Sequence, residues 1–523
     1  MLKKKLYPVV SSKEALDFEL VALMDEAKEW DAMQRAGKGI AKAARVDFSE
    51  ISPFPEDASI LALVGKGHNG GDALLAVAEI VSVSPRAKVV CLLTEPLEAL
   101  KPLTKRALET VKDSAHVECI KDLSQKDLVS KLNSLGADYG FDICIDGILG
   151  LNFKAPLSPF LSAIIGAINN YPRIRMRIAV DIPSGLDEQS DAEFLAPDFT
   201  YATGFVKGLH FVSKMNCGRV RLVDLGFESI QSENFKNEFF LTPSELDPMR
   251  VLRPSKVSKT NFGHLFIVGG SSNMPGALLM SVQAAVRSGV GLVTAFAPQS
   301  VAASLAAQVP EAMWIPWPES TNGTLSPRAL PLLFDRIKSA TALLIGPGMG
   351  RDRNVESLVQ EIINQVPLPI ICDADALGTR VVEMTSKRRD EWGRVILTPH
   401  MGEFIRISKP KERDCDNAFL KYFCESNNVL TVLKSPQTRI CDGERIFYNA
   451  LGGPVLSRGG SGDMLAGILG GILARKSNFP VEAMQQAVVW HGLAAEFLAR
   501  ERGQVAVCTT DLLDYLSQVL RSY

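Results

Sequence analysis

The sequence has 523 residues, of which 46% are hydrophobic and 22% charged, and its formal net charge is −2. This length predicts two domains, each able to bury a substantial core, and the composition is that of a soluble globular protein. Because the charge is nearly balanced and the basic residues form no extended run, we expect no nucleic-acid partner.

The first residues, MLKKKLYPVVSSKEAL, are basic but contain no long apolar segment and no small-residue cleavage site. We therefore expect no secretory signal. No apolar run approaches the length of a membrane-spanning helix, so we expect no membrane partner. The nine cysteines are scattered and include no CxxC pair. This pattern argues against a zinc site and suits a reducing cytosol, so we expect a cytoplasmic protein.

Short apolar runs dominate the first half from about residue 60. We expect strands at 60–65, 88–93, 142–146 and 177–182, and a helix at 74–81. This alternation predicts βαβ units and a parallel sheet. The segment 241–260 then carries three prolines and lacks a clean apolar period. We place the domain junction there and expect domains at 1–240 and 241–523.

The second half returns to the same alternation of strands and helices. We expect strands at 264–270, 292–297, 342–348, 369–375, 394–400 and 429–434. The two halves share no obvious sequence repeat. The sequence therefore predicts two unrelated α/β domains.

A glycine-rich loop, GKGHNGGD, lies between the first expected strand and the helix after it. Its backbone N–H groups could hold a diphosphate, and Asn69 and Asp72 add polar groups. Taken alone, such a loop is a weak signal, and the alternative is a tight turn without a ligand. Later strand ends add Asp146, Asp181 and Ser184, and acidic groups near such a loop suggest a hard cation or proton transfer.

A second glycine-rich stretch, RGGSGDML, precedes an apolar segment near residue 465. Glycines let the backbone approach a ligand, and free N–H groups at a helix start favour an anion. Asp463 could then accept a proton from a hydroxyl that attacks a phosphoryl group. The alternative is an ordinary helix whose first turn carries an aspartate.

Four further turns follow expected strands, and such turns meet at one edge of a parallel sheet. They are 346–350, 373–376, 398–403 and 434–438. Together they predict one cleft. Taken singly, Asp373 and Asp375 could be solvated strand ends, His400 a turn residue, and Glu403 a cap of the next helix.

Five segments, in order, resemble the ribokinase-like domain of ADP/ATP-dependent NAD(P)H-hydrate dehydratases: GHLFIVGGSSNMPGA, LLIGPGMG, CDADAL, LTPHMGE and GGSGDMLAGIL. The resemblance covers about residues 255–515. It implies that ADP or ATP, with Mg2+, phosphorylates the hydroxyl of a hydrated NADH or NADPH, and that loss of phosphate restores the double bond. Because fused members typically use ADP, we expect ADP as the donor, giving AMP and phosphate.

The same resemblance implies site residues by position. Asp463 is the expected base, and the expected hydrate contacts are Ala277, Gly348, His400 and Asp463. The expected nucleotide contacts are Lys434, Ser435, Pro436, Gln437, Thr438, Gly459, Gly460, Ser461 and Gly462. At 434–438 the chain has KSPQT where the family usually has KGAGT, and Pro436 removes an N–H donor.

Motifs in the first half, over about residues 10–230, look like the NAD(P)H-hydrate epimerase domain, a Rossmann-like three-layer αβα fold. They are GHNGGDA, DGILGLNFKAP, AVDIPSG and PDFTYATGFVKG. The resemblance implies interconversion of R and S hydrates, with K+ bound by Asn69, Asp146 and Ser184. It implies Asp181 as the acid–base residue. The expected hydrate contacts are His68, Asn69, Gly70, Gly71, Asp72, Gly150, Leu151, Asn152, Phe153, Lys154, Ala155, Pro156 and Asp181.

The combined interpretation is a bifunctional repair enzyme whose substrates are NADH or NADPH hydrates and ADP or ATP. The resemblance also suggests a homo-oligomer. Two alternatives stay open. One is a ribokinase-like kinase for a vitamin precursor, which would share the Asp463 chemistry. The other is a non-catalytic nucleotide-binding role for the first domain, which His68, Ala73 and Asn152 keep open because they replace the family's usual residues.

Overall fold

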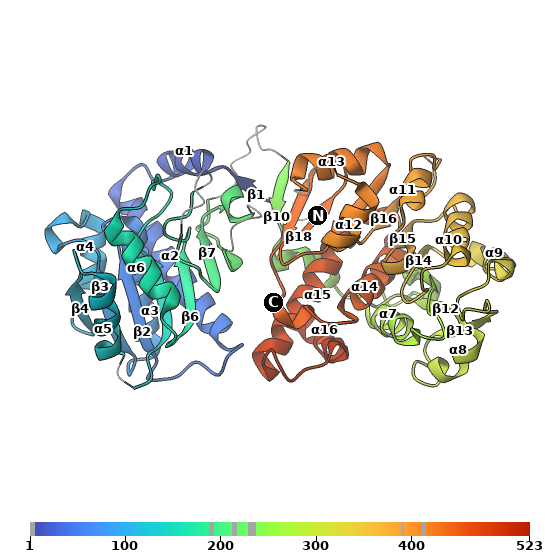
Figure 1. The fold of residues 1–523 in the computed structure, drawn as a ribbon, viewed down its shortest axis with the longest axis horizontal. Helices are drawn as coiled ribbons and strands as arrows, with labels where there is room; N and C mark the ends of the chain where they lie inside the picture. Colours follow the sequence, from blue (N-terminus) through green and yellow to red (C-terminus); the bar gives the residue numbers. More distant parts are fainter. Residues whose placement is uncertain are drawn as a thin grey trace. The chain divides into compact units, whose positions relative to one another are not determined.

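The computed structural model describes residues 6–136, 138–187, 193–211, 217–227, 237–389, 391–410 and 415–522. The chain divides into two compact units, Met1–Lys236 and Asn237–Tyr523 (Figure 1). The division lies slightly before the expected junction at 240/241, because the short strand β10 (Glu238–Phe240) pairs with the second unit's β19 (Ile446–Asn449). Among the described residues, no helix is both long and apolar enough to cross a membrane.

The first unit is built on a sheet with the strand order β4-β3-β2-β5-β6-β7-β9, and its neighbouring strands are parallel. These strands are β2 (Ser59–Val64), β3 (Lys88–Leu93), β4 (Ala115–Cys119), β5 (Phe141–Gly147), β6 (Ile174–Val180), β7 (Phe199–Thr203) and β9 (Arg219–Val223). The strand β1 (Tyr7–Val10) pairs in parallel with β8 (Val206–Lys207). The sheet order reverses at β2 and β5, which is where ligands bind in open sheets of this kind.

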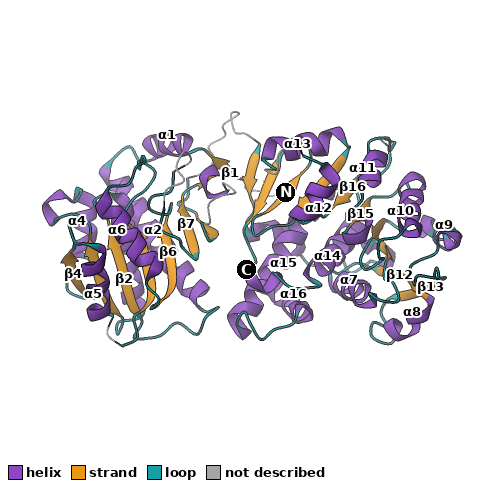
Figure 2. Ribbon diagram, in the orientation of Figure 1, coloured by secondary structure: helices purple, strands orange, loops and turns teal. Residues whose placement is uncertain are grey.

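Helices cover both faces of this sheet (Figure 2). They are α1 (Ser12–Ala22), α2 (Glu26–Phe48), α3 (His68–Val83), α4 (Pro102–Glu109), α5 (Gln125–Leu135) and α6 (Pro159–Asn170). Successive side chains of a strand point to opposite faces. Accordingly, Ile60 and Ala62 of β2 pack with α2 and α3, whereas Leu61 and Leu63 pack with α5 and α6. The unit therefore has three layers and two cores.

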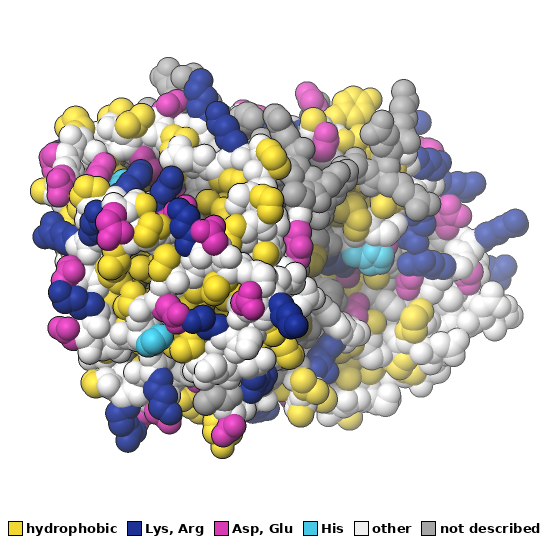
Figure 3. All heavy atoms as spheres, turned by 60° about the vertical axis from the view of Figure 1, so that its left-hand side comes forward, with side chains coloured by type: hydrophobic (Ala, Val, Ile, Leu, Met, Phe, Trp, Pro, Cys, Tyr) yellow, Lys and Arg dark blue, Asp and Glu magenta, His cyan; other side chains and the backbone are white. Residues whose placement is uncertain are grey.

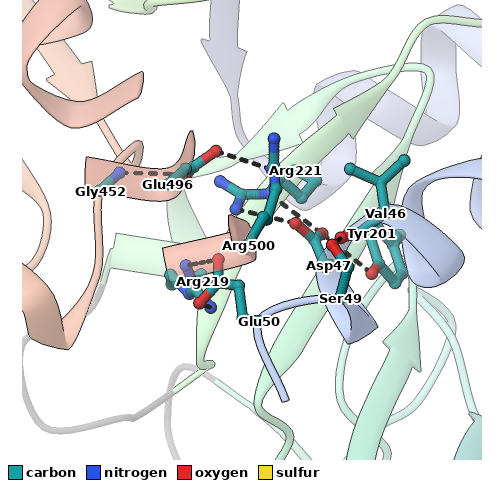
Figure 4. A network of polar contacts seen from close by, with 10 residues as sticks. All are labelled: Val46, Asp47, Ser49, Glu50, Tyr201, Arg219, Arg221, Gly452, Glu496 and Arg500. Atoms are coloured by element: carbon teal, nitrogen blue, oxygen red, sulfur yellow. Dashed lines mark hydrogen bonds and ion pairs between the residues drawn. The ribbon is translucent and has the colours of Figure 1, made fainter. Parts of the chain in front are cut away.

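Two buried acidic residues tie α2 to the sheet (Figure 4). Asp47 accepts a hydrogen bond from the Tyr201 hydroxyl at 3.1 Å and pairs with Arg221 at 3.2 Å. The Glu50 carboxylate accepts hydrogen bonds from both terminal nitrogens of Arg219, each at 2.7 Å. These contacts hold α2 and the residues just after it against β7, which carries Tyr201, and β9, which carries Arg219 and Arg221.

The second unit is built on a larger sheet with the order β13-β12-β11-β14-β15-β16-β17-β18-β19-β10. The strands other than β10 and β19 are β11 (His264–Val268), β12 (Leu292–Pro298), β13 (Met313–Trp317), β14 (Ala342–Ile345), β15 (Ile370–Cys372), β16 (Val395–Leu397), β17 (Val429–Leu433) and β18 (Thr438–Cys441). The strands from β13 to β17 are parallel, and β18 is antiparallel to both of its neighbours.

Helices of the second unit also lie on both faces of the sheet. They are α7 (Pro275–Arg287), α8 (Gln299–Ala306), α9 (Pro331–Phe334), α10 (Arg353–Gln365), α11 (Thr379–Thr385), α12 (Met401–Ser408), α13 (Asn417–Ser426), α14 (Ser461–Arg475), α15 (Pro480–Arg502) and α16 (Leu512–Arg521). Leu265 and Ile267 of β11 pack with α7, α14 and α15. Phe266, on the opposite face, packs edge-to-face against Phe296, with ring centroids 5.3 Å apart.

The glycines of α14 let it approach α7 very closely. A Cβ on Gly467 would overlap the carbonyl oxygen of Ser281, and one on Gly471 would overlap the hydroxyl of Ser288. In addition, the Ser281 hydroxyl donates to the carbonyl oxygen of Asp463 at 2.9 Å. The glycines of this helix therefore allow a close contact with the backbone and the serine side chains of α7, which fixes where the helix begins.

The ten strands expected from apolar runs are present, but several end earlier than the runs do. The run 177–182 ends as a strand at Val180, because Asp181 has a left-handed φ of +63°. The run 369–375 ends at Cys372 and is followed by Ala374 at φ +48°. On the face drawn in Figure 3, basic and acidic side chains are intermingled, so this face carries no broad patch of one sign.

Candidate active sites

The glycine-rich loop of the first unit joins β2 to α3 at the reversal of the sheet order. A Cβ on Gly70 would overlap the carbonyl oxygen of Gly65, so the turn closes tightly on itself. The Asn69 amide nitrogen donates to the carbonyl oxygens of Leu149, at 2.6 Å, and Val180, at 2.9 Å. Asn69 therefore ties together the ends of β2, β5 and β6.

Asp146, near the end of β5, is fully buried among neutral donors. Its carboxylate accepts the Ser184 hydroxyl at 2.6 Å, the Ser184 N–H at 2.8 Å and the Ile148 N–H at 3.2 Å. Burial raises the pKa of Asp146 to about 6, although the Ser184 hydrogen bonds act in the opposite direction. In the part of the chain that the structure describes, Asp146 forms no ion pair. A buried carboxyl group beside the Ser184 hydroxyl fits a hard cation that prefers oxygen ligands.

Asp181 follows β6 directly and holds one carboxylate oxygen in a fixed position. Oδ1 accepts the Thr203 N–H at 3.0 Å and the Thr203 hydroxyl at 3.1 Å, and it also pairs with the Lys207 ammonium. The other oxygen, Oδ2, accepts no hydrogen bond among the described residues. The backbone of Asp181 is left-handed, a conformation that is uncommon outside glycine and recurs at functional sites.

Lys207 is completely buried, and its charged hydrogen-bond partner among the described residues is Asp181. Its ammonium also donates to the Thr203 carbonyl oxygen at 3.1 Å. His210, in the short 3-10 helix Gly208–Phe211, donates from Nε2 to the Asp181 carbonyl oxygen at 2.8 Å. Burial, and next the charge of Lys207, lower the pKa of His210 to about 4, so this imidazole is neutral at pH 7.

Two more carboxyl groups face the Asp181–Lys207 pair. Asp72, in the first turns of α3, is buried, and its Oδ1 has no hydrogen-bond partner among the described residues. Burial raises its pKa well above the usual value, and the charges of Asp181 and Glu19 add to this. Burial also raises the pKa of Glu19, on α1, to about 7, while Lys207 counteracts part of the shift.

The expected hydrate loop connects β5 to α6 and is largely exposed. Gly150 lies against Asn69, since an added Cβ would come within 2.9 Å of Oδ1 of that side chain. The Phe153 N–H donates to the Gly150 carbonyl oxygen at 2.9 Å, which closes a turn. Leu151 packs against Ile182, on the segment after β6. The exposed members of this loop are Asn152, Lys154, Ala155 and Pro156.

His68 is the first residue of α3 and stands at the edge of this site. Its side chain is about half exposed, and Nε2 lies 4.0 Å from a carboxylate oxygen of Glu29. Burial, and next the charge of Lys101, lower the pKa of His68. A Cβ on Gly71 would overlap the methyl group of Met33, so the helix start packs directly on α2.

In the second unit, turns follow five adjacent strands, β11, β14, β15, β16 and β17, at one edge of the sheet. Gly348 has φ +65°, and an added Cβ would lie 3.0 Å from the Cβ of Ala277. Gly346 has φ +122°, and a Cβ there would overlap the carbonyl oxygen of Asp373. The expected hydrate contacts Ala277 and Gly348 are therefore immediate neighbours, and their turn touches the end of β15.

Lys434 and Asp373 form an ion pair at the ends of β17 and β15. The ammonium lies 2.9 Å from Oδ1 of Asp373, which also accepts the Thr398 hydroxyl at 2.6 Å. Although burial alone would lower the pKa of Lys434, the charge of Asp373 raises it. A Cβ on Gly462 would lie 3.1 Å from the Lys434 ammonium. The positive charge therefore stands beside the start of α14.

Asp463 is in the first turn of α14, whose N-cap is Gly460 in a left-handed conformation. No side chain caps the helix, and nothing lies within 4 Å of a Cβ added to Gly459. The first N–H groups are thus free of side-chain caps, as anion binding requires. Burial, and next the charge of Asp373, raise the pKa of Asp463 to about 7, while Lys434 lowers it.

His400 and Glu403 form a capping box at the start of α12. The Glu403 N–H donates to His400 Nδ1 at 3.2 Å, and the His400 N–H donates to the Glu403 carboxylate at 3.0 Å. Asp375 accepts the Gly350 N–H at 2.9 Å and the Nε of Arg351 at 3.0 Å. His400 and Glu403 therefore do cap the helix, and the His400 side chain remains 60% exposed.

The segment 434–438 links β17 to β18 and is locked by its own side chains. The Ser435 hydroxyl donates to the Gln437 carbonyl oxygen at 2.7 Å, and the Thr438 hydroxyl donates to the Ser435 carbonyl oxygen at 3.0 Å. Pro436 has no N–H to offer a phosphate. Lys434 is consequently the strongest anion-binding group that this segment directs toward α14.

The structure thus brings the expected residues into two clusters, one in each unit. Sequence reasoning missed two members of the first cluster, Lys207 and Glu19. A lysine within the apolar run of PDFTYATGFVKG was a usable signal for Lys207. Glu19 had no signal, because it is one acidic residue among several on an amphipathic helix. The role of Asp373 as the partner of Lys434 was also missed, since the two are 61 residues apart.

The fold is that of a two-unit α/β protein with a cluster of ionisable side chains at the strand ends of each unit. A family model described as NAD(P)H-hydrate dehydratase matches residues 265–518, and one described as YjeF-related protein N-terminus matches residues 30–209. The bifunctional NAD(P)H-hydrate repair enzyme Nnr of Moorella thermoacetica is 32% identical over 481 residues, covering 88% of this chain and 87% of the relative. The chain belongs to the family of bifunctional NAD(P)H-hydrate repair enzymes.

Further similarities cover either the whole chain or the second unit's share of it. The Nnr protein of Gloeobacter violaceus is 28% identical and covers 89% of each chain. A solved ADP/ATP-dependent NAD(P)H-hydrate dehydratase from Bacillus subtilis, co-crystallised with ATP and Mg2+, is 28% identical, with a TM-score of 0.44 over 52% of this chain and 93% of that one. The predicted fold class is confirmed: a Rossmann-like three-layer unit precedes a ribokinase-like α/β unit.

Proposed function

We propose that the second unit dehydrates the S hydrate of NADH or NADPH at the expense of ADP or ATP, and that the first unit interconverts the R and S hydrates. The observation that carries this proposal is the pair of acid–base clusters, one in each unit, at the sheet edges where ligands of such folds bind. Membership of the family supports the pairing of the two activities in one chain. The product of the first unit is then the substrate of the second.

In the dehydratase, Asp463 is the proposed base. The hydrate hydroxyl attacks the terminal phosphoryl group of the nucleotide, and Asp463 takes the hydroxyl proton. The anion hole at the start of α14 and the Lys434 ammonium stabilise the charge on the transferring group. Phosphate then leaves with the C–O electron pair, because it is a far better leaving group than hydroxide. The neighbouring ring carbon loses a proton to solvent, and the C–H electron pair forms the ring double bond. Ala277, Gly348 and His400 are the proposed hydrate contacts.

Magnesium would enter this site with the nucleotide. Mg2+ bound to nucleotide phosphates keeps several waters and uses one or two protein carboxylates. Three acidic groups whose charges act on Asp463, namely Asp373, Asp375 and Glu403, fit that requirement. When bound, the ion would neutralise charge on the phosphates. We propose ADP as the donor, with AMP and phosphate as products; the fusion of the two units favours ADP.

In the epimerase, Asp181 is the proposed acid–base residue, with its free Oδ2 directed to the reacting hydroxyl. Expulsion of hydroxide gives a ring cation, and water then adds to the opposite face. The oxygen atoms of Asn69, Asp146 and Ser184 would hold K+, which would supply a fixed positive charge beside the glycine-rich loop. The loop residues from His68 to Asp72 and from Gly150 to Pro156 are the proposed hydrate contacts.

Two further proposals concern the setting of the enzyme. We propose a cytoplasmic location, and the nine free cysteines are consistent with a reducing compartment. We also propose a homo-oligomer, for which family resemblance is the support.

The test uses the full chain and a mixture of R and S NADH hydrates in K+ buffer. Recovery of NADH is followed with ADP and, separately, with ATP. Full recovery with one donor is the expected result, and it identifies that donor. Recovery that stops at the S fraction, beyond slow spontaneous epimerisation, would contradict the epimerase half. No recovery with either donor would favour the kinase for a vitamin precursor, and a stable phosphorylated product should then be found.

Replacing K+ by an organic cation such as tetramethylammonium sharpens the test. We expect epimerisation to fall while dehydration of pure S hydrate is unchanged. Asp146→Asn should produce the same loss in K+ buffer. An epimerisation rate that is equal in both buffers would contradict the proposed K+ site.

A further inference from the structure

Helix α1 carries a carboxyl group, Glu19, to the acid–base cluster of the first unit. The register of β1 against β8 places Val10 opposite Lys207, so the start of α1 is tied to the strand that carries the buried lysine. The Ser11 hydroxyl caps α1 in a capping box. Further along the helix, the ring of Phe18 lies 5.5 Å from that of Phe205, between β7 and β8. These contacts place α1 beside the segment that carries Lys207, and Glu19 is near enough for the charges of Lys207 and Asp181 to act on it.

The cluster contains more acidic than basic groups. Glu19, Asp72 and Asp181 share the single ammonium of Lys207, and His210 is neutral. Asp181 takes that ammonium as its partner. The Glu19 carboxyl forms no hydrogen bond or ion pair among the residues that the structure describes. Unlike Asp181, Glu19 can therefore gain or lose a proton without breaking an ion pair.

Glu19 is better placed than Asp72 to exchange a proton during turnover. Asp72 is 8% exposed, whereas Glu19 remains partly open to solvent. Groups in one site that are held in opposite protonation states are the arrangement that general acid–base catalysis needs. Burial holds Glu19 near the midpoint of its titration at neutral pH, because its pKa is raised to about 7.

We propose that Glu19 is a further acid–base residue of the epimerase and protonates the departing hydroxyl group. The inference rests on the proposed function of the first unit. The C–O bond breaks and its electron pair goes to the oxygen, which takes the Glu19 proton and leaves as water. The lone pair of the ring nitrogen forms the C=N bond of the cationic intermediate.

Water then adds to the opposite face of the ring. Its lone pair forms the new C–O bond, the C=N pair returns to nitrogen, and Oδ2 of Asp181 takes the proton from the added water. In the reverse direction the two carboxyl groups exchange roles. Between the two steps, Glu19 is a carboxylate that faces the ring cation, so it also stabilises the charge that develops there.

The experiment starts from pure R hydrate without nucleotide and follows the formation of S hydrate by chromatography. Glu19→Gln should lower kcat by about 10²-fold or more, as expected for loss of a general acid. The kcat of the wild type should fall at alkaline pH as Glu19 loses its proton, and this fall should be absent from Glu19→Gln. Glu19→Asp, which keeps a carboxyl group, should retain the fall at a reduced rate.

Asp17→Asn is the matched control, because Asp17 is exposed on the same helix. It should epimerise like the wild type. Thermal unfolding of each variant verifies that the first unit is folded. If the wild type epimerises but Glu19→Gln keeps its rate, the inference is overturned and the proposed function stands. A lower rate with an unchanged pH profile overturns it as well. If the wild type itself does not epimerise, the proposed function fails first.

Discussion

Each unit pairs one lysine with one aspartate at a strand end, but the relation of this pair to the proposed acid–base residue differs between the units. In the first unit Lys207 pairs with Asp181, the proposed acid–base residue itself. In the second unit Lys434 pairs with Asp373, 2.9 Å away, and the proposed base Asp463 is left without an ion-pair partner among the described residues. The same pairing thus places the proposed acid–base residue of the first unit in an ion pair and leaves that of the second unit outside one.

The difference fits the chemistry proposed for each unit. A cationic intermediate is stabilised by carboxylates, so a first unit with an acidic surplus and a charged Asp181 is complementary to it. Phosphoryl transfer instead needs a base that gains a proton near neutral pH beside a fixed positive charge. Asp463, with a pKa of about 7, and Lys434, beside Gly462, supply those two parts.

The largest expected effect comes from removing the titrating group of the second unit. Asp463→Asn should lower dehydration of pure S hydrate by about 10²–10⁴-fold, the usual contribution of a general base. Epimerisation of R hydrate by the same variant should be unchanged, because the change lies in the other unit. Dehydration at the wild-type rate would remove Asp463 from the mechanism.

Breaking the pair of the first unit should affect stability as well as rate. Lys207→Met leaves Asp181 buried without its counter-charge, which costs about 3–5 kcal/mol in comparable cases. We expect an earlier unfolding transition in urea and loss of epimerisation. The double variant Lys207→Met/Asp181→Asn should regain part of the stability but none of the activity. If the single variant is as stable as the wild type, the pair is not a structural requirement.

Lys434→Met tests the corresponding pair of the second unit. We expect kcat for dehydration to fall by about 10²-fold, as when one charge-stabilising donor is removed. In the wild type kcat/KM should rise with pH through about 7, as Asp463 loses its proton. Because the lysine charge lowers the pKa of Asp463, the midpoint in Lys434→Met should move to higher pH. A profile with its midpoint unchanged would mean that Lys434 does not act on Asp463.

The smallest expected effect is on thermal stability. The folded chain binds the Asp463 proton more tightly than the unfolded chain, since burial raises the pKa from 3.8 to about 7. This stabilising contribution is fully present below 3.8 and is lost as the pH rises to about 7. Asp463→Asn should therefore unfold about 2 °C or more above the wild type at pH 8. Calorimetry should find the difference shrinking toward pH 5, and a constant difference would contradict the assignment.

Local patterns predicted much of this molecule. The apolar runs marked ten strands, and glycine-rich turns marked both site loops and the start of α14. Other strands were not predicted, among them β4, whose sequence AHVEC is largely polar, and β13, which lies at the edge of its sheet and contains Pro316. The spacing of His400 and Glu403 allowed their capping box to be anticipated, since its partners are three residues apart.

Contacts between segments that are distant in the sequence could not be predicted from local patterns. Lys207 becomes significant only when β8 carries it to the end of β6, and Glu19 only when α1 is laid over that pair. Likewise, Asp373 and Lys434 meet because β15, β16 and β17 are neighbours in the sheet. A single sequence states which residues follow one another but not which strands pair, so these electrostatic partners came from the topology.

The glycine contact between α14 and α7 has a mechanical consequence. Asp463 lies on a helix whose distance from α7 is set by the contact of Gly467 with the Ser281 carbonyl group and of Gly471 with the Ser288 hydroxyl group. A methyl group added at either position would push the whole helix outward and carry the base with it. Displacements of about 1 Å can cost 10²-fold in rate. Positions one and two helical turns from the reacting atoms therefore limit how freely this enzyme can drift in sequence.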